Sequence, residues 1–166
     1  MSVGTLVSVE QYLNTAYDPD VEYVDGVLVE RNVGDWLHSL IQSNIIFALR
    51  KKYPFLKVVP ELRSQTTETR FRLPDISVLA IPPQTRYLLE AALIAVEILS
   101  EDDRMTQVVE KLTEYEGKGI RNIWLIDPRL QLVSVFKQGA LVPVHGDLVR
   151  AEQPDVELTR AEIFQA

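Results

Sequence analysis

The chain has 166 residues, of which 46% are hydrophobic and 25% are charged, a composition that fits one globular domain with a single substantial core. The absence of cysteine excludes disulfides and cysteine-rich zinc sites. Because the chain has only two histidines, far apart in sequence, we expect oxygen ligands for any metal. No apolar run is long enough to span a bilayer and no signal peptide begins the chain, so we expect a soluble cytoplasmic protein.

The formal net charge of −7 argues against nonspecific coating of nucleic acid, which requires clustered lysine and arginine. The charge is unevenly distributed, however, because residues 50–72 contain seven basic and only two acidic side chains. Two interpretations stay open at this point. The segment either faces a polyanion or is an ordinary solvated helix end followed by a loop.

The first half of the chain contains clear signals for two helices and a hairpin. A short helix is expected within residues 7–17, after Ser8. Asp25 and Gly26 separate two β-rich runs, and this pair favours a type I′ turn because both central residues of that turn need positive φ. Apolar residues at helical spacing then predict an amphipathic helix over residues 35–52, which Pro54 ends.

The second half is richer in strands. We expect strands over residues 56–64, 72–79, 93–99 and 122–127, and a closing hairpin around Gly139. A helix should begin at Ser100, with Asp103 in an approximate capping box, and end near Glu116. The order of elements predicts an α/β fold, a mixed β-sheet flanked by helices, in a single domain over residues 1–166.

Two of these strands each carry a carboxylate among apolar residues: Asp75 in LPDISVLAI and Glu97 in AALIAVEIL. A buried ionised carboxylate needs a compensating charge or a metal. If the strands are neighbours, both carboxylates can meet at one edge of the sheet and hold Mg²⁺ or Mn²⁺. Each carboxylate also has an interpretation without a metal. Asp75 could be an ordinary aspartate at the start of an edge strand, after Pro74, and Glu97 could form a buried ion pair with a basic residue.

Lys111 is the candidate for a third functional group. It shares a helical stripe with Val108, Leu112 and Tyr115, on the face expected to pack against the sheet. Its ammonium group would reach either a polar pocket, where it could contact the attacking water or a phosphate, or the solvent. Tyr115 and Trp124 are expected to pack in the core, with their polar tips hydrogen-bonded near the rim.

The string RLPDISV, then VEILS, then Lys111, Tyr115, Gly119, Trp124 and Asp127-Pro128 resembles the putative restriction endonuclease family of the PD-(D/E)XK nuclease superfamily. The segment EYVDG at residues 22–26 and His38 in the following helix also look like that family's N-terminal elements. The resemblance covers most of the chain and implies a restriction-endonuclease-like fold.

The resemblance further implies that Asp75 and Glu97 are metal ligands, together with a backbone carbonyl next to Glu97, and that Lys111 replaces the usual superfamily lysine. That lysine lies two residues after the acidic residue, where this chain has Leu99. A second departure is Gln107, at a position where the family commonly has an acidic residue.

Two accessory candidates come from the same resemblance. Glu22 would approach the metal site, although an exposed strand glutamate is the common alternative. His38 would act as a catalytic base, against the alternative of a boundary histidine bonded to backbone or water.

These residues together predict a Mg²⁺- or Mn²⁺-dependent endonuclease that hydrolyses DNA by a metal-activated water. A domain of this size cannot readily span both DNA strands, so a homodimer is expected from symmetry. The alternative is a noncatalytic nucleic-acid or protein binding module that keeps the nuclease fold, which the acidic balance and Gln107 favour.

Overall fold

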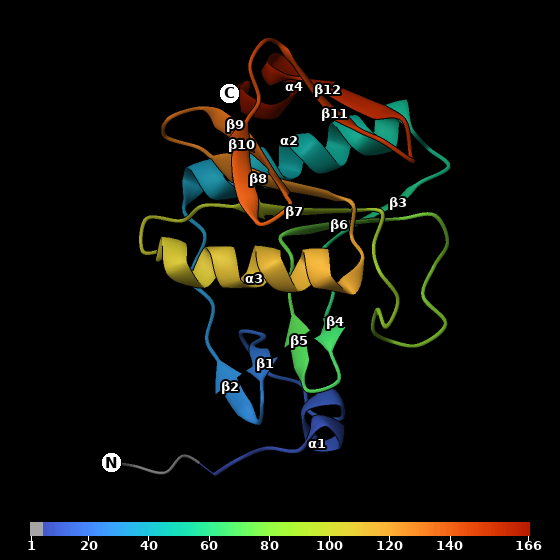
Figure 1. Cartoon of the computed structure of the whole chain (residues 1–166), viewed down its shortest axis with the longest axis vertical. Coiled ribbons are helices and arrows are strands. Elements are labelled where there is room, and N and C mark those ends of the chain that lie inside the picture. Colours follow the sequence, from blue (N-terminus) through green and yellow to red (C-terminus); the bar gives the residue numbers. More distant parts are fainter. Residues whose placement is uncertain (1–4) are drawn as a thin grey trace.

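The computed structural model describes residues 5–166 as an α/β fold built on a central six-stranded sheet (Figure 1). The strand order is β10-β9-β8-β7-β6-β3, with β7 and β8 parallel and the other neighbours antiparallel. The bounds of its strands are Lys57–Pro60 for β3, Ile76–Leu79 for β6, Ile94–Ile98 for β7, Asn122–Asp127 for β8, Leu132–Lys137 for β9 and Ala140–Pro143 for β10.

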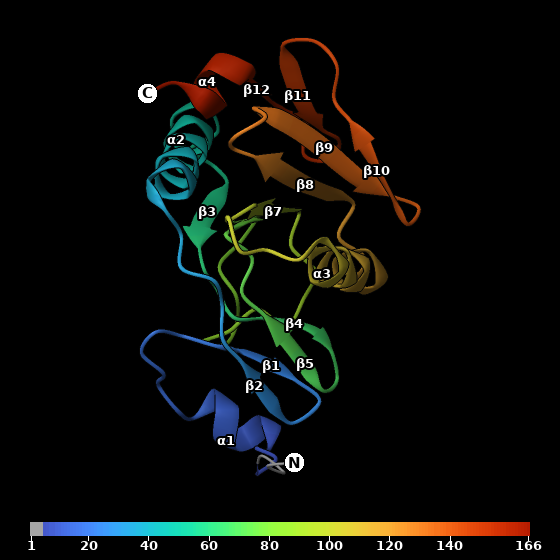
Figure 2. The same ribbon diagram turned by 90° about the vertical axis from the view of Figure 1, so that its left-hand side faces the viewer.

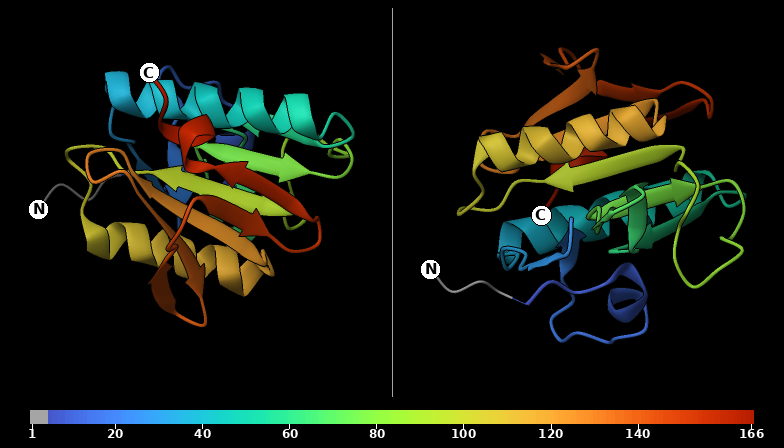
Figure 3. Two further views of the ribbon diagram at one scale, coloured as in Figure 1. Left: turned by 90° about the horizontal axis from the view of Figure 1, so that it is seen from above. Right: turned by 60° about the horizontal axis from the view of Figure 1, so that its bottom comes forward.

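Helices cover both faces of this sheet (Figure 3). One face packs against α2 (Trp36–Lys52), together with the short strands β11 (Leu148–Ala151) and β12 (Val156–Thr159) and the helix α4 (Arg160–Phe164). The other face packs against α3 (Met105–Lys118). Along β7 the side chains alternate, since Val96 belongs to the core under α2 and Ala95 to the core under α3. The mixed sheet flanked by helices is therefore confirmed.

A smaller unit lies below the main sheet in the view of Figure 2. It contains α1 (Val9–Leu13) and a second, four-stranded sheet of order β2-β1-β5-β4. Its strands are Glu22–Val24 for β1, Val27–Val29 for β2, Ser64–Thr67 for β4 and Arg70–Arg72 for β5. A separate cluster of buried aromatic and aliphatic side chains, with Tyr12, Tyr23 and Phe71 at its centre, holds this unit together.

Several local predictions are confirmed at the level of single residues. Asp25 and Gly26 have φ values of 51° and 93°, as the predicted turn between β1 and β2 requires. Ser8 caps α1, and the Asp35 side chain accepts a hydrogen bond from the His38 amide at the start of α2. Strand β8 has the predicted bounds of residues 122–127.

Other boundaries differ from the prediction. The helix expected from Ser100 begins at Met105, after a turn at residues 101–102. The Asp103 side chain does accept a hydrogen bond from the Ser100 amide, as in the predicted capping box, but no helix follows it directly. The predicted strands 56–64 and 72–79 are each divided between the two sheets, as the chain crosses from β3 to β4 and returns from β5 to β6. Within the described residues the buried Trp124 Nε1 has no hydrogen-bond partner, so the prediction for its polar tip is wrong.

None of the helices in residues 5–166 combines the length and the apolar character that crossing a bilayer would need.

Candidate active site

Asp75 and Glu97 lie on neighbouring strands at the same level of the main sheet. Asp75 directly precedes β6, and the antiparallel register pairs Ile76 with Val96, so the next pair along is Asp75 opposite Glu97. Directly opposite residues share a face of the sheet. The Ile98 amide also donates a 2.7 Å hydrogen bond to Asp75 Oδ2. Both carboxylates are buried and line one cavity.

Asp75 is held in its charged form by donors from two other segments. Arg31 Nη2 lies 2.9 Å and His38 Nε2 3.2 Å from Asp75 Oδ1. Burial alone would raise the pKa of Asp75, but His38, Arg31 and the Ile98 amide favour the anion and hold that pKa below its ordinary value. The pKa of His38 is raised in turn, since its contact with Asp75 outweighs the opposite effect of burial.

Glu97 has a different environment, although it lies beside Asp75. The Tyr115 hydroxyl donates a 2.5 Å hydrogen bond to Glu97 Oε1, and Lys111 Nζ lies 3.3 Å from Oε2. Burial raises the pKa of Glu97 to about 7; Asp75 and Glu22 add to this effect, and Lys111 and Tyr115 oppose it. Two close carboxylates with separated pKa values are typical of functional sites.

Lys111 reaches the site from α3 and does not extend into solvent. Its Nζ lies 3.0 Å from Glu22 Oε1 and 3.3 Å from Glu97 Oε2, and its side chain is 17% exposed. Burial would lower its pKa, but these carboxylates and Asp75 raise it above the ordinary value, so the ammonium form is favoured. Glu22 is 3% exposed, and the expectation of an exposed strand glutamate is therefore wrong.

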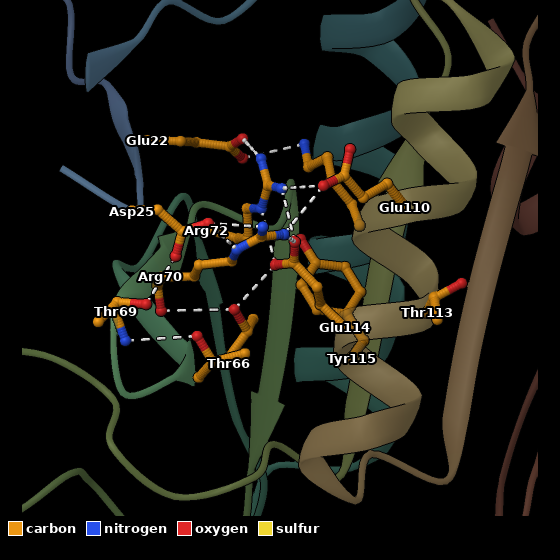
Figure 4. A network of polar contacts seen from close by, with 12 residues as sticks. Glu22, Asp25, Thr66, Thr69, Arg70, Arg72, Glu110, Thr113, Glu114 and Tyr115 are labelled. Carbon is orange, nitrogen blue, oxygen red and sulfur yellow. Dashed lines mark hydrogen bonds and ion pairs between the residues drawn. The ribbon is translucent and has the colours of Figure 1, made fainter. Parts of the chain in front are cut away.

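A network of ion pairs holds the side chain of Glu22 in place (Figure 4). Arg72 Nη1 lies 3.0 Å from Glu22 Oε2, and the Leu73 amide donates to Glu22 Oε1. The same guanidinium donates hydrogen bonds of 2.9 and 2.7 Å to the two oxygens of Glu114 on α3, and Glu114 also accepts one from Arg70. The network thus connects the four-stranded sheet to α3 at the site.

Replacing Glu114 with glutamine should make stability less dependent on pH. Burial would raise the pKa of Glu114, but hydrogen bonds from Arg72, Arg70 and Thr66 hold it below its ordinary value of 4.5. Since the folded pKa is lowered, the charged carboxylate stabilises the fold above pH 4.5, and this contribution is lost as the pH falls through the folded value. We expect Glu114→Gln to lower the free energy of unfolding by about 2 kcal/mol at pH 7 and by much less at pH 3.

Urea unfolding at both pH values measures this difference, and Glu110→Gln is the matched control. Glu110 lies on the same helix and contacts Arg70, but its side chain is 51% exposed, so its loss should cost less than about 1 kcal/mol. A destabilisation by Glu114→Gln that is equal at pH 7 and pH 3 would contradict the prediction.

The cavity at this site has a volume of about 220 Å³ and contains all five sequence-predicted candidates: Asp75, Glu97, Lys111, Glu22 and His38. Gln107 also lines it. Within residues 5–166, no group of three or more His, Cys, Asp or Glu side chains is arranged to hold a metal ion. The two facing carboxylates are nevertheless hard oxygen donors that suit Mg²⁺ or Mn²⁺, with backbone carbonyl or water completing the shell.

Three contacting residues were not predicted as part of the site. Arg31 lies in the loop after β2, where no periodic pattern marks it. Arg72 and Tyr115 belong to the residues that carry the family resemblance, but the sequence assigns Arg72 no role beyond the basic segment and places Tyr115 in the core, with its polar tip bonded as expected. Much of that basic segment is used internally, since Arg63, Arg70 and Arg72 pair with acidic side chains.

Comparison with known proteins then places the chain. A model of the family described as putative restriction endonuclease matches residues 9–163. The chain belongs to this family. Its fold also resembles the crystal structure of a putative nuclease belonging to DUF820 from Anabaena variabilis, with a TM-score of 0.79 and 24% identity over 95% of this chain and 97% of that one.

A cryo-EM structure of a DrdV-DNA complex aligns with a TM-score of 0.35 and 13% identity over 64% of this chain and 82% of that one. No curated protein matches the chain. The family match and the first structure confirm the predicted family and the restriction-endonuclease-like fold. The protein is thus a member of this family with a restriction-endonuclease-like fold. Its polar cavity contains the facing carboxylates of Asp75 and Glu97.

Proposed function

We propose that this protein is a metal-dependent endonuclease of the PD-(D/E)XK superfamily that hydrolyses DNA phosphodiester bonds, with Mg²⁺ or Mn²⁺ held by Asp75 and Glu97. The observation that carries the proposal is the placement of these carboxylates opposite each other in one cavity, with a partly buried ammonium beside them. Membership of a restriction endonuclease family supports the same reaction class. A bound divalent ion would lower the pKa of a coordinated water and neutralise charge on the phosphate.

In this reaction, the oxygen of a water molecule forms a bond to phosphorus while one phosphorus–oxygen bond to a sugar breaks. The water loses a proton and the departing sugar oxygen gains one. Lys111 is suited to orient the water or to stabilise negative charge on the phosphate, because its ammonium group is fixed by Glu22 and Glu97. His38 is suited to an accessory role, since it contacts Asp75 directly.

DNA as the substrate and a homodimer as the active form belong to the same proposal. A two-fold symmetric dimer would match the symmetry of duplex DNA and bring one site to each strand. Light scattering after size-exclusion chromatography, with and without a DNA duplex, tests the dimer separately from the chemistry.

A noncatalytic binding module is the second candidate function. Arg31 and Lys111 already neutralise Asp75 and Glu97 without any metal, as in a structural ion-pair cluster. Gln107 lines the cavity where the family commonly has an acidic residue.

A plasmid-nicking assay in Mg²⁺, Mn²⁺ or EDTA separates the two functions. The endonuclease proposal predicts cleavage that needs the metal and is lost in both Asp75→Ala and Glu97→Ala. Circular dichroism verifies that the variants are folded. Absence of cleavage by the wild-type protein in either metal, with supercoiled, linear and single-stranded DNA, would favour the binding module.

A further inference from the structure

The carboxylate of Asp75 contacts three donors, and two of them share the oxygen Oδ1. Its Oδ2 accepts from the Ile98 amide, and its Oδ1 contacts both Arg31 Nη2 and His38 Nε2. The amide belongs to β7 and the histidine to α2, so both donors are fixed by regular structure. A cation that binds Oδ1 therefore has to displace a donor, and the arginine is the one that regular structure does not hold.

Arg31 is located in the loop between β2 and α2 and contacts two carboxylates at once. Its Nη2 lies 2.9 Å from Asp75, and its Nη1 lies 3.5 Å from Glu61 Oε1. Glu61 directly follows β3, whose last residue, Pro60, pairs with Ile76, the residue after Asp75. Glu61 is half exposed at 50%, whereas Asp75 is 5% exposed, so the guanidinium bridges an inner and an outer carboxylate.

We propose that Arg31 is a built-in competitor of the divalent cation at Asp75, and that Glu61 retains the displaced guanidinium when the cation binds. This inference rests on the metal site of the proposed function. It assigns to Arg31 and Glu61 the control of metal affinity, a role separate from ligation and from the chemical step.

The physical reason is the charge balance of a buried site. Without a metal, Asp75 and Glu97 repel each other and lose hydration, and the permanently charged guanidinium of Arg31 compensates Asp75. A divalent ion supplies the same compensation, so the two cations exclude each other at Oδ1. The outer carboxylate lowers the cost of displacement, because Arg31 can leave Asp75 without losing its only ionic partner.

Calorimetric titration of the full-length protein with Mn²⁺ tests this competition without any measurement of cleavage. We expect Arg31→Gln to bind Mn²⁺ about tenfold more tightly than the wild type, since the competitor is gone. Arg104→Gln is the control for general electrostatics, because Arg104 is an exposed residue just before α3 and has no ion pair in the described part of the chain. An equal gain in both variants, or no gain in Arg31→Gln, would overturn the proposal.

A double-mutant cycle then tests the part assigned to Glu61. Glu61→Gln should weaken Mn²⁺ binding about threefold in the wild-type background, and the same change should have no effect in the Arg31→Gln background. Equal effects of Glu61→Gln in both backgrounds would mean that Glu61 acts on the metal directly, which contradicts its role as a holder of Arg31.

Two further variants keep the outcomes distinguishable. We expect Asp75→Ala to lose Mn²⁺ binding. Unchanged Mn²⁺ binding in this variant would reject the proposed metal site itself, in addition to the competition by Arg31. If Arg31→Gln is unfolded by circular dichroism, Arg31→Lys replaces it, since a single ammonium cannot contact Asp75 and Glu61 through separate nitrogens. In the Arg31→Lys background, Glu61→Gln should then weaken Mn²⁺ binding less than it does in the wild-type background. An equal weakening in both backgrounds would overturn the proposal.

Discussion

Replacing Lys111 with methionine should lower the rate of DNA cleavage by at least about a hundredfold while leaving Mn²⁺ binding as tight as in the wild type or tighter. The ammonium group lies between Glu22 and Glu97 and contacts no other acidic side chain within the described residues. Its loss removes the charge that we assign to the water or the phosphate. It also leaves Glu97 without its cation, which strengthens the attraction of that carboxylate for a metal ion.

Single-turnover cleavage and Mn²⁺ calorimetry on the same preparation measure the two effects. Lys137→Met is the matched control, because Lys137 is an exposed residue at the end of β9. Cleavage by Lys111→Met within a few fold of the wild type would assign this lysine to charge compensation alone. A parallel loss of metal binding would instead make it part of the framework of the metal site.

Replacing Arg72 with methionine should cost about 3–5 kcal/mol of the free energy of unfolding. The Arg72 side chain is 6% exposed and pairs with two buried carboxylates, those of Glu22 and Glu114. Its removal leaves both charges buried without this partner, and that cost exceeds the net value of the ion pairs themselves. The four-stranded sheet and α3 would also lose a connection at the site.

Urea unfolding provides the measurement, and Arg70→Met is the control from the same strand. Arg70 pairs with Glu114 as well, but its side chain is 27% exposed, so we expect a loss near 1 kcal/mol. A second change, Glu22→Gln in the Arg72→Met background, should recover part of the stability, because one buried charge is then removed. Equal losses for Arg70→Met and Arg72→Met would contradict this account of burial.

The meeting of Asp75 and Glu97 was predictable because strand periodicity limits the choices. Each carboxylate interrupts an apolar strand, and alternation fixes which neighbours share its face. What alternation cannot supply is the register between two strands. The pairing of Ile76 with Val96 depends on packing across the whole sheet, and a shift by one residue would have separated the two side chains.

The residues that sequence reasoning missed lie where local patterns carry little information. Arg31 is in a loop without periodicity, and its partners are 30 and 44 positions away in the chain. Arg72 looks like one more charge in a basic segment until the fold brings Glu22 and Glu114 to it. The strands β11 and β12 and the helix α4 were missed, although the capping box of Thr159 and Glu162 was visible in the sequence.

A crystal of the wild-type protein soaked in Mn²⁺, with anomalous scattering recorded at the manganese edge, tests the central claim most directly. We predict one strong anomalous peak in the cavity, in contact with carboxylate oxygens of both Asp75 and Glu97, with Arg31 displaced from Asp75. A fully occupied ion elsewhere on the protein, or a soaked crystal in which Arg31 and Lys111 keep their contacts and no peak lies between the two carboxylates, would contradict it.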